Sequence, residues 1–349
     1  MNKNTNGSVP TFLPGIAVLV SFIVWCLPVH GASPEKAAGY EERADVRAFI
    51  ADLSQREGFD PRDLSRLFAS VERQDSILKA IARPAEAKPW YEYRKIFLTP
   101  ARIEGGAQFY AEHRETLERA SKDYGVAPEV IVAIIGVETL YGTRTGKHRV
   151  LDALTTLGFD YEPRKKFFRR ELEEFLLLSR EESLDSPMVK GSYAGAMGIG
   201  QFIPSSYRAY AVDFDGDGKR DLWNPVDAIG SVASYFSRHG WRNGEVVTAP
   251  ASVTGNGHRK LLKKGTKPAI PSESLNKAGV VVEGVDLNGH KVALLEYDSN
   301  GEEKEFWIGF HNFYVITRYN RSQLYAMAVH QLSEEIARTV EASEEVAKQ

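Results

Sequence analysis

Residues 128–142, PEVIVAIIGVETLYG, constrain the fold of this chain more than any other stretch. Pro128 suits the first turn of a helix, where its missing N–H is not needed. Glu138 shares one helix face with three isoleucines, and valines cover much of the rest, which predicts a buried helix. Burial of a carboxyl is unfavourable unless it is paired or neutral, and it raises the carboxyl pKa. Glu138 is therefore either a structural glutamate bonded to backbone or arginine, or a general acid.

The first segment of the chain differs from the rest. In residues 1–32, Lys3 precedes an apolar run at 16–27, and small residues follow at 31–32. This pattern predicts a cleaved secretory signal peptide, with a retained anchor as the alternative. Cys26, the single cysteine, follows bulky residues, which argues against a lipoprotein. The mature chain then has no disulfides, although an exported protein could form them.

The remaining chain is mainly α-helical in its periodicity, with a small antiparallel β insertion. A length of 349 residues allows one large domain or two to three smaller ones, and a net charge of -3 argues against nucleic-acid binding. We expect a helical subdomain, a helical core and a C-terminal return to that core. Their ranges are 40–86 with 158–190, 87–157 with 191–243, and 311–340. Single helices are expected at 102–124, 152–157, 165–180 and 321–340.

Residues 244–310 lose the helical period and form the β insertion. Asn288-Gly289 and Asn300-Gly301 separate three apolar runs and predict two type I′ hairpins. A basic run at 259–267 is either a solvated surface or a contact for an anionic polymer. The expected strands are 280–285, 291–297 and 304–308.

The segment 191–207, GSYAGAMGIGQFIPSSY, is rich in small residues, which allow close approach of the backbone. It is either a site of tight helix packing or a cleft wall in which Ser192 and Gln201 bind substrate. The aromatic cluster around Tyr93 leaves the same choice between a core and a sugar-binding cleft. The tyrosines at 314–325 could rejoin such a cleft.

The segment 213–227 has the spacing of an EF-hand loop. Aspartates occupy positions 1, 3, 5 and 9, glycine position 6, and Lys219 position 7, where its carbonyl can bind. Asn224 replaces the usual Glu at position 12, and Asp227 could close a longer loop. The alternative is an Asp/Gly-rich turn without metal. Hard oxygen ligands favour structural calcium, with sodium as a second candidate. The candidate ligands are Asp213, Asp215, Asp217, Lys219, Asp221 and Asp227.

Four segments together resemble the soluble/membrane-bound lytic transglycosylase B family of bacterial cell-wall enzymes. They are GVETLYG, SYAGAMGIGQFIPSSY, DFDGDGKRDLWNPVDAIGSVASYF and NFYVITRYNRSQLYAMAV, in order along the chain. The resemblance covers residues 40–335. It implies a lysozyme-like helical core, a helical subdomain and a small β subdomain around a peptidoglycan groove, and a metal loop of greater than usual length.

Carried to this sequence, the resemblance implies that Glu138, in the E-T-x-Y/W-G motif, is the catalytic acid/base. It also implies a set of groove residues, of which the last two rest on less distinctive context. These are Ser192, Gln201, Tyr235, Tyr319, Asn320, Tyr325, Tyr93 and Arg164.

The implied reaction is cleavage of the β-1,4 bond between N-acetylmuramic acid and N-acetylglucosamine with formation of a 1,6-anhydro ring, without a catalytic cofactor. A hydrolytic muramidase and a non-catalytic, calcium-dependent wall-binding protein are the rival hypotheses. The expected partners are peptidoglycan glycan strands and cell-wall synthases. We expect a periplasmic monomer, with association with the inner or outer membrane as an option.

Overall fold

The computed structural model describes residues 39–82, 88–287, 289–301 and 303–348. The predicted signal peptide at 1–32 lies outside the described residues. Within the described ranges, each helix is too short or too polar to cross a membrane.

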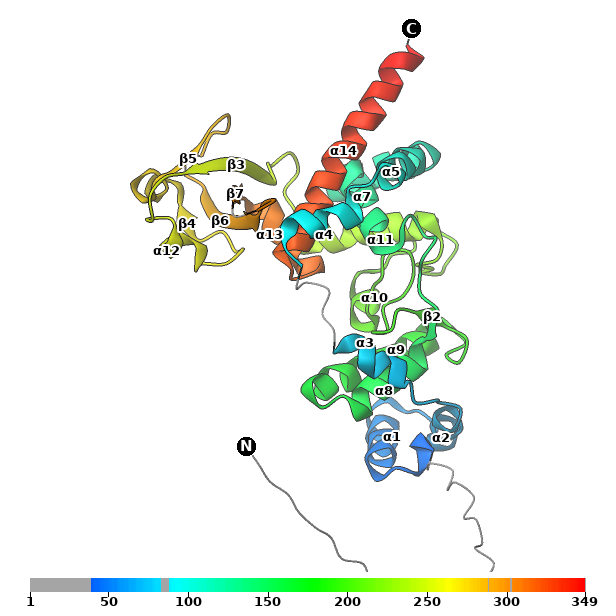
Figure 1. The fold of residues 1–349 in the computed structure, drawn as a ribbon. Coiled ribbons are helices and arrows are strands. Elements are labelled where there is room, and N and C mark those ends of the chain that lie inside the picture. The colour runs from blue at the N-terminus through cyan, green and yellow to red at the C-terminus, as the bar shows by residue number, and fades with distance from the viewer. Residues whose placement is uncertain (1–38, 83–87, 288, 302, 349) are drawn as a thin grey trace, which may run out of the picture. The chain divides into compact units, whose positions relative to one another are not determined.

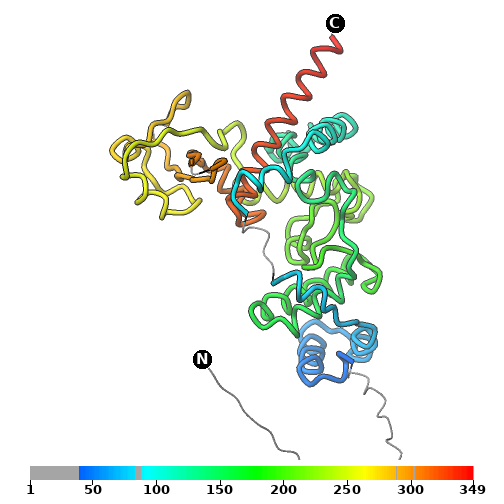
Figure 2. The backbone as a smooth tube through the Cα atoms, viewed as in Figure 1, coloured from blue at the N-terminus to red at the C-terminus, as the bar shows by residue number. Residues whose placement is uncertain are grey.

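Helices from two distant parts of the sequence pack together in one helical group. Helix α8 packs along α9, and α3 lies against α8, so the N-terminal helices meet the segment that follows residue 149 (Figures 1 and 2). Asp60 begins α2 because its side chain accepts a hydrogen bond of 2.7 Å from Arg62 N. The elements are η1 (Tyr40–Glu42), α1 (Ala44–Glu57), α2 (Pro61–Ala69), α3 (Asp75–Ile81), α8 (Val150–Asp160), η3 (Glu162–Arg164) and α9 (Lys165–Glu181).

The predicted central helix is α7 (Pro128–Thr139), and nearly all of its side chains are buried. It packs against α5, α6, α11 and α14, which confirms its place in the core. The single helix expected at 102–124 is wrong, because the chain breaks at His113 between α5 and α6. The other core elements are α4 (Trp90–Phe97), α5 (Pro100–Glu112), α6 (Arg114–Tyr124), α10 (Pro204–Tyr210) and α11 (Pro225–Arg238), with a small ladder of β1 (His148–Arg149) and β2 (Lys190–Gly191).

The β insertion is a five-stranded antiparallel sheet with the strand order β4-β6-β7-β3-β5. The hairpin predicted at Asn288-Gly289 is wrong, because β5 pairs with β3 and not with β6. The hairpin at Asn300-Gly301 exists between β6 and β7, but Asp298 pairs with Lys304, so its loop is longer than a type I′ turn. The elements are β3 (Thr248–Val253), α12 (Arg259–Leu262), β4 (Ile270–Pro271), η4 (Ser272–Ser274), η5 (Asn276–Ala278), β5 (Val280–Val282), β6 (Lys291–Asp298) and β7 (Lys304–Gly309).

The C-terminal segment returns to the core as two helices, α13 (His311–Tyr319) and α14 (Gln323–Ala347), rather than as the one helix expected at 321–340. Ser322 separates them and caps α14, since its hydroxyl accepts a hydrogen bond from Tyr325 N. Helix α14 packs against α7, α5 and α4. The expected boundary between 157 and 158 falls inside α8, and the division into subdomains stays a prediction.

Candidate active site

Glu138 lies in the last turn of α7, where the helix ends in a tight reversal. Leu140 and Tyr141 both have left-handed backbone, with φ of 50° and 58°. This reversal lays the ring of Tyr141 over Gly136, where a Cβ would lie 2.5 Å from the Tyr141 hydroxyl oxygen. The hydroxyl donates a hydrogen bond of 2.5 Å to Arg102 O, which fixes the ring. The E-T-L-Y-G sequence thus builds the end of the helix around Glu138.

Glu138 as a residue is partly exposed, and burial of its carboxyl raises the pKa from 4.5 to about 7. The Tyr325 hydroxyl donates a hydrogen bond of 2.6 Å to Glu138 Oε1, which lowers the pKa by a smaller amount. Among the described residues, the hydrogen-bond partner of this carboxyl is a tyrosine, and neither an arginine nor a backbone group. The predicted rise in pKa is confirmed, and near neutral pH the protonated and ionised forms are comparably populated.

Two further tyrosines, Tyr319 and Tyr235, donate their hydroxyls to backbone carbonyls. Tyr319 donates to Gly200 O at 2.5 Å, and Tyr235 donates to Arg318 O at 2.6 Å. Their rings meet edge to face, with centroids 4.8 Å apart. Burial raises the pKa of Tyr319 and of Tyr325, and the charge of Glu138 raises both further, so both tyrosines are neutral.

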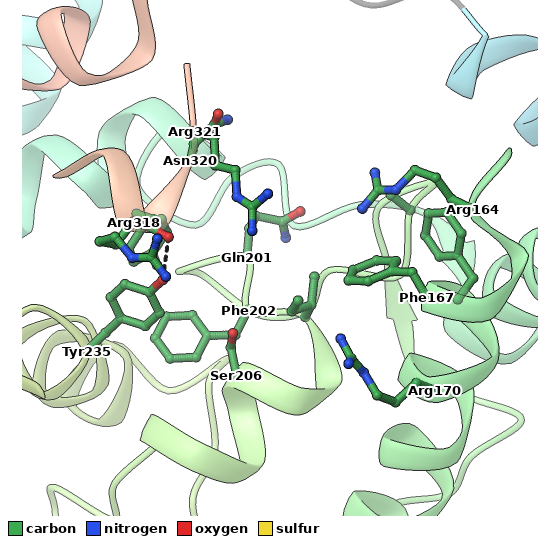
Figure 3. A pocket seen from close by; sticks show the side chains of 14 residues that line it. Arg164, Phe167, Arg170, Gln201, Phe202, Ser206, Tyr235, Arg318, Asn320 and Arg321 are labelled. Atoms are coloured by element: carbon green, nitrogen blue, oxygen red, sulfur yellow. Dashed lines mark hydrogen bonds between the residues drawn. The ribbon is translucent and has the colours of Figure 1, made fainter. Parts of the chain in front are cut away.

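A cavity of about 720 Å³ adjoins the tyrosines and brings together five of the predicted groove residues. Figure 3 shows Arg164 and Phe167 on one side, Tyr235 and Arg318 on the other, and Gln201 between them. The five predicted residues are Arg164, Gln201, Tyr235, Tyr319 and Asn320. Glu138, Tyr325, Ser192 and Tyr93 are outside the cavity lining.

Ser192 and Tyr93 have structural contacts, which agree with the packing alternatives that the sequence left open for both. Ser192 Oγ accepts hydrogen bonds from the N–H groups of Ala194 and Ala196, at 3.3 and 3.0 Å, and so closes a turn. Tyr93 is 6% exposed and its ring stacks on that of Trp90. It lies close enough to Tyr325 to raise the pKa of that hydroxyl. A substrate contact for Ser192 or Tyr93 stays a prediction.

The small residues of 191–207 serve both of the functions left open by the sequence. Gly198 has a φ of 72°, and a Cβ there would lie 2.4 Å from Leu222 Cβ, so close packing requires glycine. Gln201 lies in the cavity wall, while its Nε2 donates to Thr145 O and Gly198 O at 3.0 and 2.9 Å. The segment is a tightly packed turn with one face toward the cavity.

Sequence reasoning missed three of the four arginines that line the cavity, namely Arg170, Arg318 and Arg321. Each of the three is exposed, and of the described residues that line the cavity none is acidic. The only local signal is that Arg318 and Arg321 flank Tyr319-Asn320. The aromatic lining residues Phe167, Phe168 and Phe202 were also missed as site residues.

The two aspartates that could have served as a second catalytic acid are committed elsewhere. Asp152 is 3% exposed and pairs with Arg149 at 3.4 Å. Asp160 pairs with Arg43 at 2.6 Å and accepts a hydrogen bond of 2.5 Å from Tyr40. Among the described groups, no second carboxyl contributes to the pKa of Glu138. Neither aspartate therefore pairs with Glu138.

The acidic loop brings Asp213, Asp215 and Asp227 together, with one carboxylate oxygen of each within 4.8 Å of the others. The third member of this group is Asp227 and not Asn224, whose side chain caps α11 and donates a hydrogen bond of 2.6 Å to Asp215 Oδ2. The Asp227 carboxylate also accepts backbone N–H bonds from Phe214, Asp215 and Asp221 at 2.7 to 3.2 Å. Three converging carboxylates suit a hard cation that takes oxygen ligands.

Other predicted ligands lie outside this group of three. Asp217 Oδ1 accepts from Lys219 N at 2.9 Å, and Asp221 Oδ1 accepts from Trp223 N at 2.9 Å. These bonds shape the loop backbone. Metal ligation by Asp217, Asp221 and the Lys219 carbonyl stays a prediction.

A partly buried glutamate with a raised pKa, set beside an aromatic cavity in a mainly helical fold, is the arrangement of an enzyme that protonates a glycosidic oxygen. Comparison with known proteins agrees with this class. The family model described as "Transglycosylase SLT domain" matches residues 41–334. The chain is 44% identical to the membrane-bound lytic murein transglycosylase B of Escherichia coli (strain K12) over 89% of this chain and 87% of the relative.

Solved structures show the same fold. Soluble lytic transglycosylase SltB1 of Pseudomonas aeruginosa is 51% identical with a TM-score of 0.80, over 84% of this chain and 99% of that chain. Escherichia coli Slt35, solved in complex with calcium, is 43% identical with a TM-score of 0.78, over 86% and 94%. Pseudomonas aeruginosa SltB3, solved with a NAG-NAM-pentapeptide, is 31% identical with a TM-score of 0.74, over 86% and 80%. The chain belongs to the transglycosylase SLT domain family and is a lytic transglycosylase with a lysozyme-like fold.

Proposed function

We propose that Glu138 is the single acid/base with which the chain cleaves the β-1,4 bond between N-acetylmuramic acid and N-acetylglucosamine in peptidoglycan. The observation that carries the proposal is the pKa of about 7, which burial gives to the carboxyl of a residue that is itself partly exposed. A general acid is most effective when its pKa lies near the working pH. The relative solved with a NAG-NAM-pentapeptide supports a glycan of this type as the substrate.

The reaction needs one proton donor that later becomes a base. Protonated Glu138 donates its proton to the glycosidic oxygen, and the C1–O bond of the muramoyl residue breaks. The N-acetyl carbonyl of that sugar stabilises the positive anomeric carbon. Ionised Glu138 then takes the proton of the muramoyl 6-hydroxyl as its oxygen attacks C1, which closes the 1,6-anhydro ring. Proton and bond changes balance without water, and Glu138 is again protonated.

Several features of the site support this cycle. Most glycoside hydrolases need a second carboxyl for a nucleophile or for activation of water. Asp152 and Asp160 are held by Arg149 and Arg43, and among the described residues that line the cavity none is acidic. The Tyr325 hydroxyl stabilises the ionised form that acts as base. In this scheme Ser192 orients the N-acetyl group, and Tyr93, Gln201, Asn320 and Arg164 contact the glycan.

We propose that the acidic loop binds calcium in a structural role through Asp213, Asp215 and Asp227. The relative solved with calcium supports this choice over sodium. The loop leads directly into α11, which carries Tyr235, so the ion would hold one wall of the cavity in place. The calcium ion takes no part in the proposed reaction.

We place the enzyme in the periplasm, exported by the signal peptide at 1–32, because its substrate lies there. A membrane association agrees with the name of the Escherichia coli relative. It acts as a monomer on glycan strands, with cell-wall synthases as protein partners. The helical subdomain, the core and the β subdomain of residues 244–310 would enclose the strand.

Product analysis of digested peptidoglycan tests the proposal. The wild-type chain should release 1,6-anhydromuropeptides, and Glu138→Gln should fold and bind glycan but release none. Glu129→Gln, on the first turn of the same helix, is the matched control and should keep full activity. Products heavier by one water would identify a hydrolytic muramidase. Retained turnover by Glu138→Gln would exclude Glu138 as the acid/base, and an inactive wild type would favour a wall-binding protein.

A further inference from the structure

Thr139, the residue after Glu138, is buried and joins the end of α7 to another segment. It is 0% exposed, and its hydroxyl lies 2.8 Å from Ile199 O, to which it donates. The Thr139 hydroxyl oxygen also accepts a hydrogen bond of 3.0 Å from the N–H of Gly142. Ile135 O, the usual acceptor for a threonine within a helix, is farther away at 3.2 Å. The Thr139 side chain therefore forms a hydrogen bond to the segment 191–207 as well as to its own helix.

The backbone segment that accepts the Thr139 hydroxyl, Ile199-Gly200, also accepts the hydroxyl of Tyr319. Gly200 O, one residue after Ile199, accepts the Tyr319 hydroxyl at 2.5 Å. Tyr319 lines the cavity beside Gln201. Two neighbouring carbonyls of one backbone turn thus hold Thr139, which is next to Glu138 in sequence, and Tyr319, which lines the cavity.

The position of Ile199 is itself set by the exit of the acidic loop. Leu222 O accepts the N–H of Ile199 at 2.8 Å, and Leu222 is fully buried. Leu222 follows Asp221, whose N–H is held by Asp227 Oδ2 at 2.7 Å. Three hydrogen bonds, linked through the backbone of Asp221-Leu222 and of Ile199, therefore connect the Asp227 carboxylate to Thr139.

We propose that Thr139 is a positioning residue: its bond to Ile199 O fixes the end of α7 that carries Glu138 and couples this end to the acidic loop. The inference rests on the proposed acid/base function of Glu138. A small displacement of a catalytic group lowers the rate of the chemical step, while substrate binding by the rest of the groove is retained.

Thr139→Val keeps the shape of the side chain and removes the hydroxyl. We expect kcat to fall by about tenfold to a hundredfold with KM changed less than about threefold. Thr139→Ser restores the hydroxyl and should return kcat to within about threefold of the wild type. Valine places a methyl group next to Ile199 O, which could prevent folding. Thr139→Ala removes the hydroxyl without adding this methyl group, and it should show the same loss of kcat.

Thr155→Val is the matched control. Thr155 is also a fully buried helical threonine, but its hydroxyl has no hydrogen-bond partner among the described residues. Its replacement should leave kcat unchanged. Unchanged kcat in Thr139→Val or Thr139→Ala, or a loss in Thr139→Ser equal to that in Thr139→Val, would overturn the positioning role. Glu138→Gln in the same assay keeps the two proposals separate, since its turnover depends on the acid/base function alone.

Amide hydrogen exchange tests the coupling to the loop without any measurement of activity. Removal of calcium by a chelator should speed exchange at Ile199 N–H, which Leu222 O accepts. Exchange at Ile77 N–H, bonded to Gln74 O in a helix far along the chain, should not change. Equal exchange at Ile199 with and without the ion would overturn the coupling.

Discussion

The Tyr325 hydroxyl lies 2.6 Å from Glu138 Oε1, and the two residues are 187 positions apart in the sequence. The bond joins the last turn of α7 to the first turn of α14. It brings a neutral donor to a carboxyl that burial would otherwise keep protonated to higher pH. The pKa of Glu138, about 7, therefore reflects burial opposed by this one hydrogen bond.

Tyr325→Phe should raise the pKa of Glu138, because a donor to the ionised form is lost. If the protonated acid is needed for cleavage, kcat/KM falls as pH rises through this pKa, near pH 7 in the wild type. We expect the midpoint of this fall to move upward by about 0.5 to 1 pH unit in the variant. The pH profile of kcat/KM is the measurement.

Tyr235→Phe is the control for this experiment, since it removes a tyrosine hydroxyl that donates to Arg318 O instead. Its midpoint should equal that of the wild type. A downward shift in Tyr325→Phe would contradict the assigned direction of the hydrogen bond.

Glu138→Gln should stabilise the fold, by an amount that grows with pH. Because the folded-state pKa is raised from 4.5 to about 7, the glutamate destabilises the folded state progressively as pH rises through this window. Glutamine stays neutral throughout. We expect a gain in the free energy of unfolding from under about 1 kcal/mol at pH 5 to about 3 kcal/mol at pH 8.

Urea denaturation at several pH values measures this gain. Glu129→Gln serves again as the control on the same helix and should show no such trend. A gain that is constant with pH would mean that the carboxyl is not buried in its charged form.

Local sequence patterns predicted the parts of this enzyme that depend on residues close together in the chain. Helix α7 follows from its apolar residues and Pro128, and the loop from the spacing of Asp213 and Asp215. Asp227, the candidate to close a longer loop, lies with Asp213 and Asp215, and its ligation of a metal stays a prediction. The raised pKa of Glu138 followed from its apolar helix face.

Pairings between distant segments could not be predicted in this way. The Asn288-Gly289 turn signal is local, whereas the partner of β5 is β3, which the sequence did not show to be a strand. The break at His113 lacks the glycine or proline that usually ends a helix. The arginines of the cavity come from segments more than a hundred residues apart, Arg170 from α9 and Arg318 from α13, so only the folded chain shows their convergence.

Calcium should raise the thermal stability of the chain if the acidic loop binds it. An ion that binds only the folded state stabilises it by about 3 kcal/mol at 100 times its Kd, which corresponds to a rise in Tm on the order of 5 °C. Asp213→Asn removes one of the three converging carboxylates and should abolish the rise. Asp123→Asn, an exposed aspartate on α6, should leave it intact. A Tm that is the same with calcium and with chelator would exclude the site.

Gly136→Ala tests whether the packing of Tyr141 determines the end of α7. Alanine favours a helix by about 1 kcal/mol over glycine, but here its methyl would lie 2.5 Å from the Tyr141 hydroxyl oxygen. The tyrosine has little room to move, because it is bonded to Arg102 O and its ring lies against Gly105. Overpacking should therefore prevail, with a net loss of about 1–3 kcal/mol in the free energy of unfolding.

The loss should be accompanied by lower kcat, since a displaced Tyr141 alters the turn that carries Glu138. Gly158→Ala is the matched control: it lies inside α8, and the nearest atoms to its added Cβ are Cγ and the backbone N of Arg169, both at 3.3 Å, against 2.5 Å at Gly136. Its free energy of unfolding should change by less than about 1 kcal/mol, with kcat unaffected. If Gly136→Ala were as stable and as active as Gly158→Ala, the contact with Tyr141 could not be what sets the geometry of the acid.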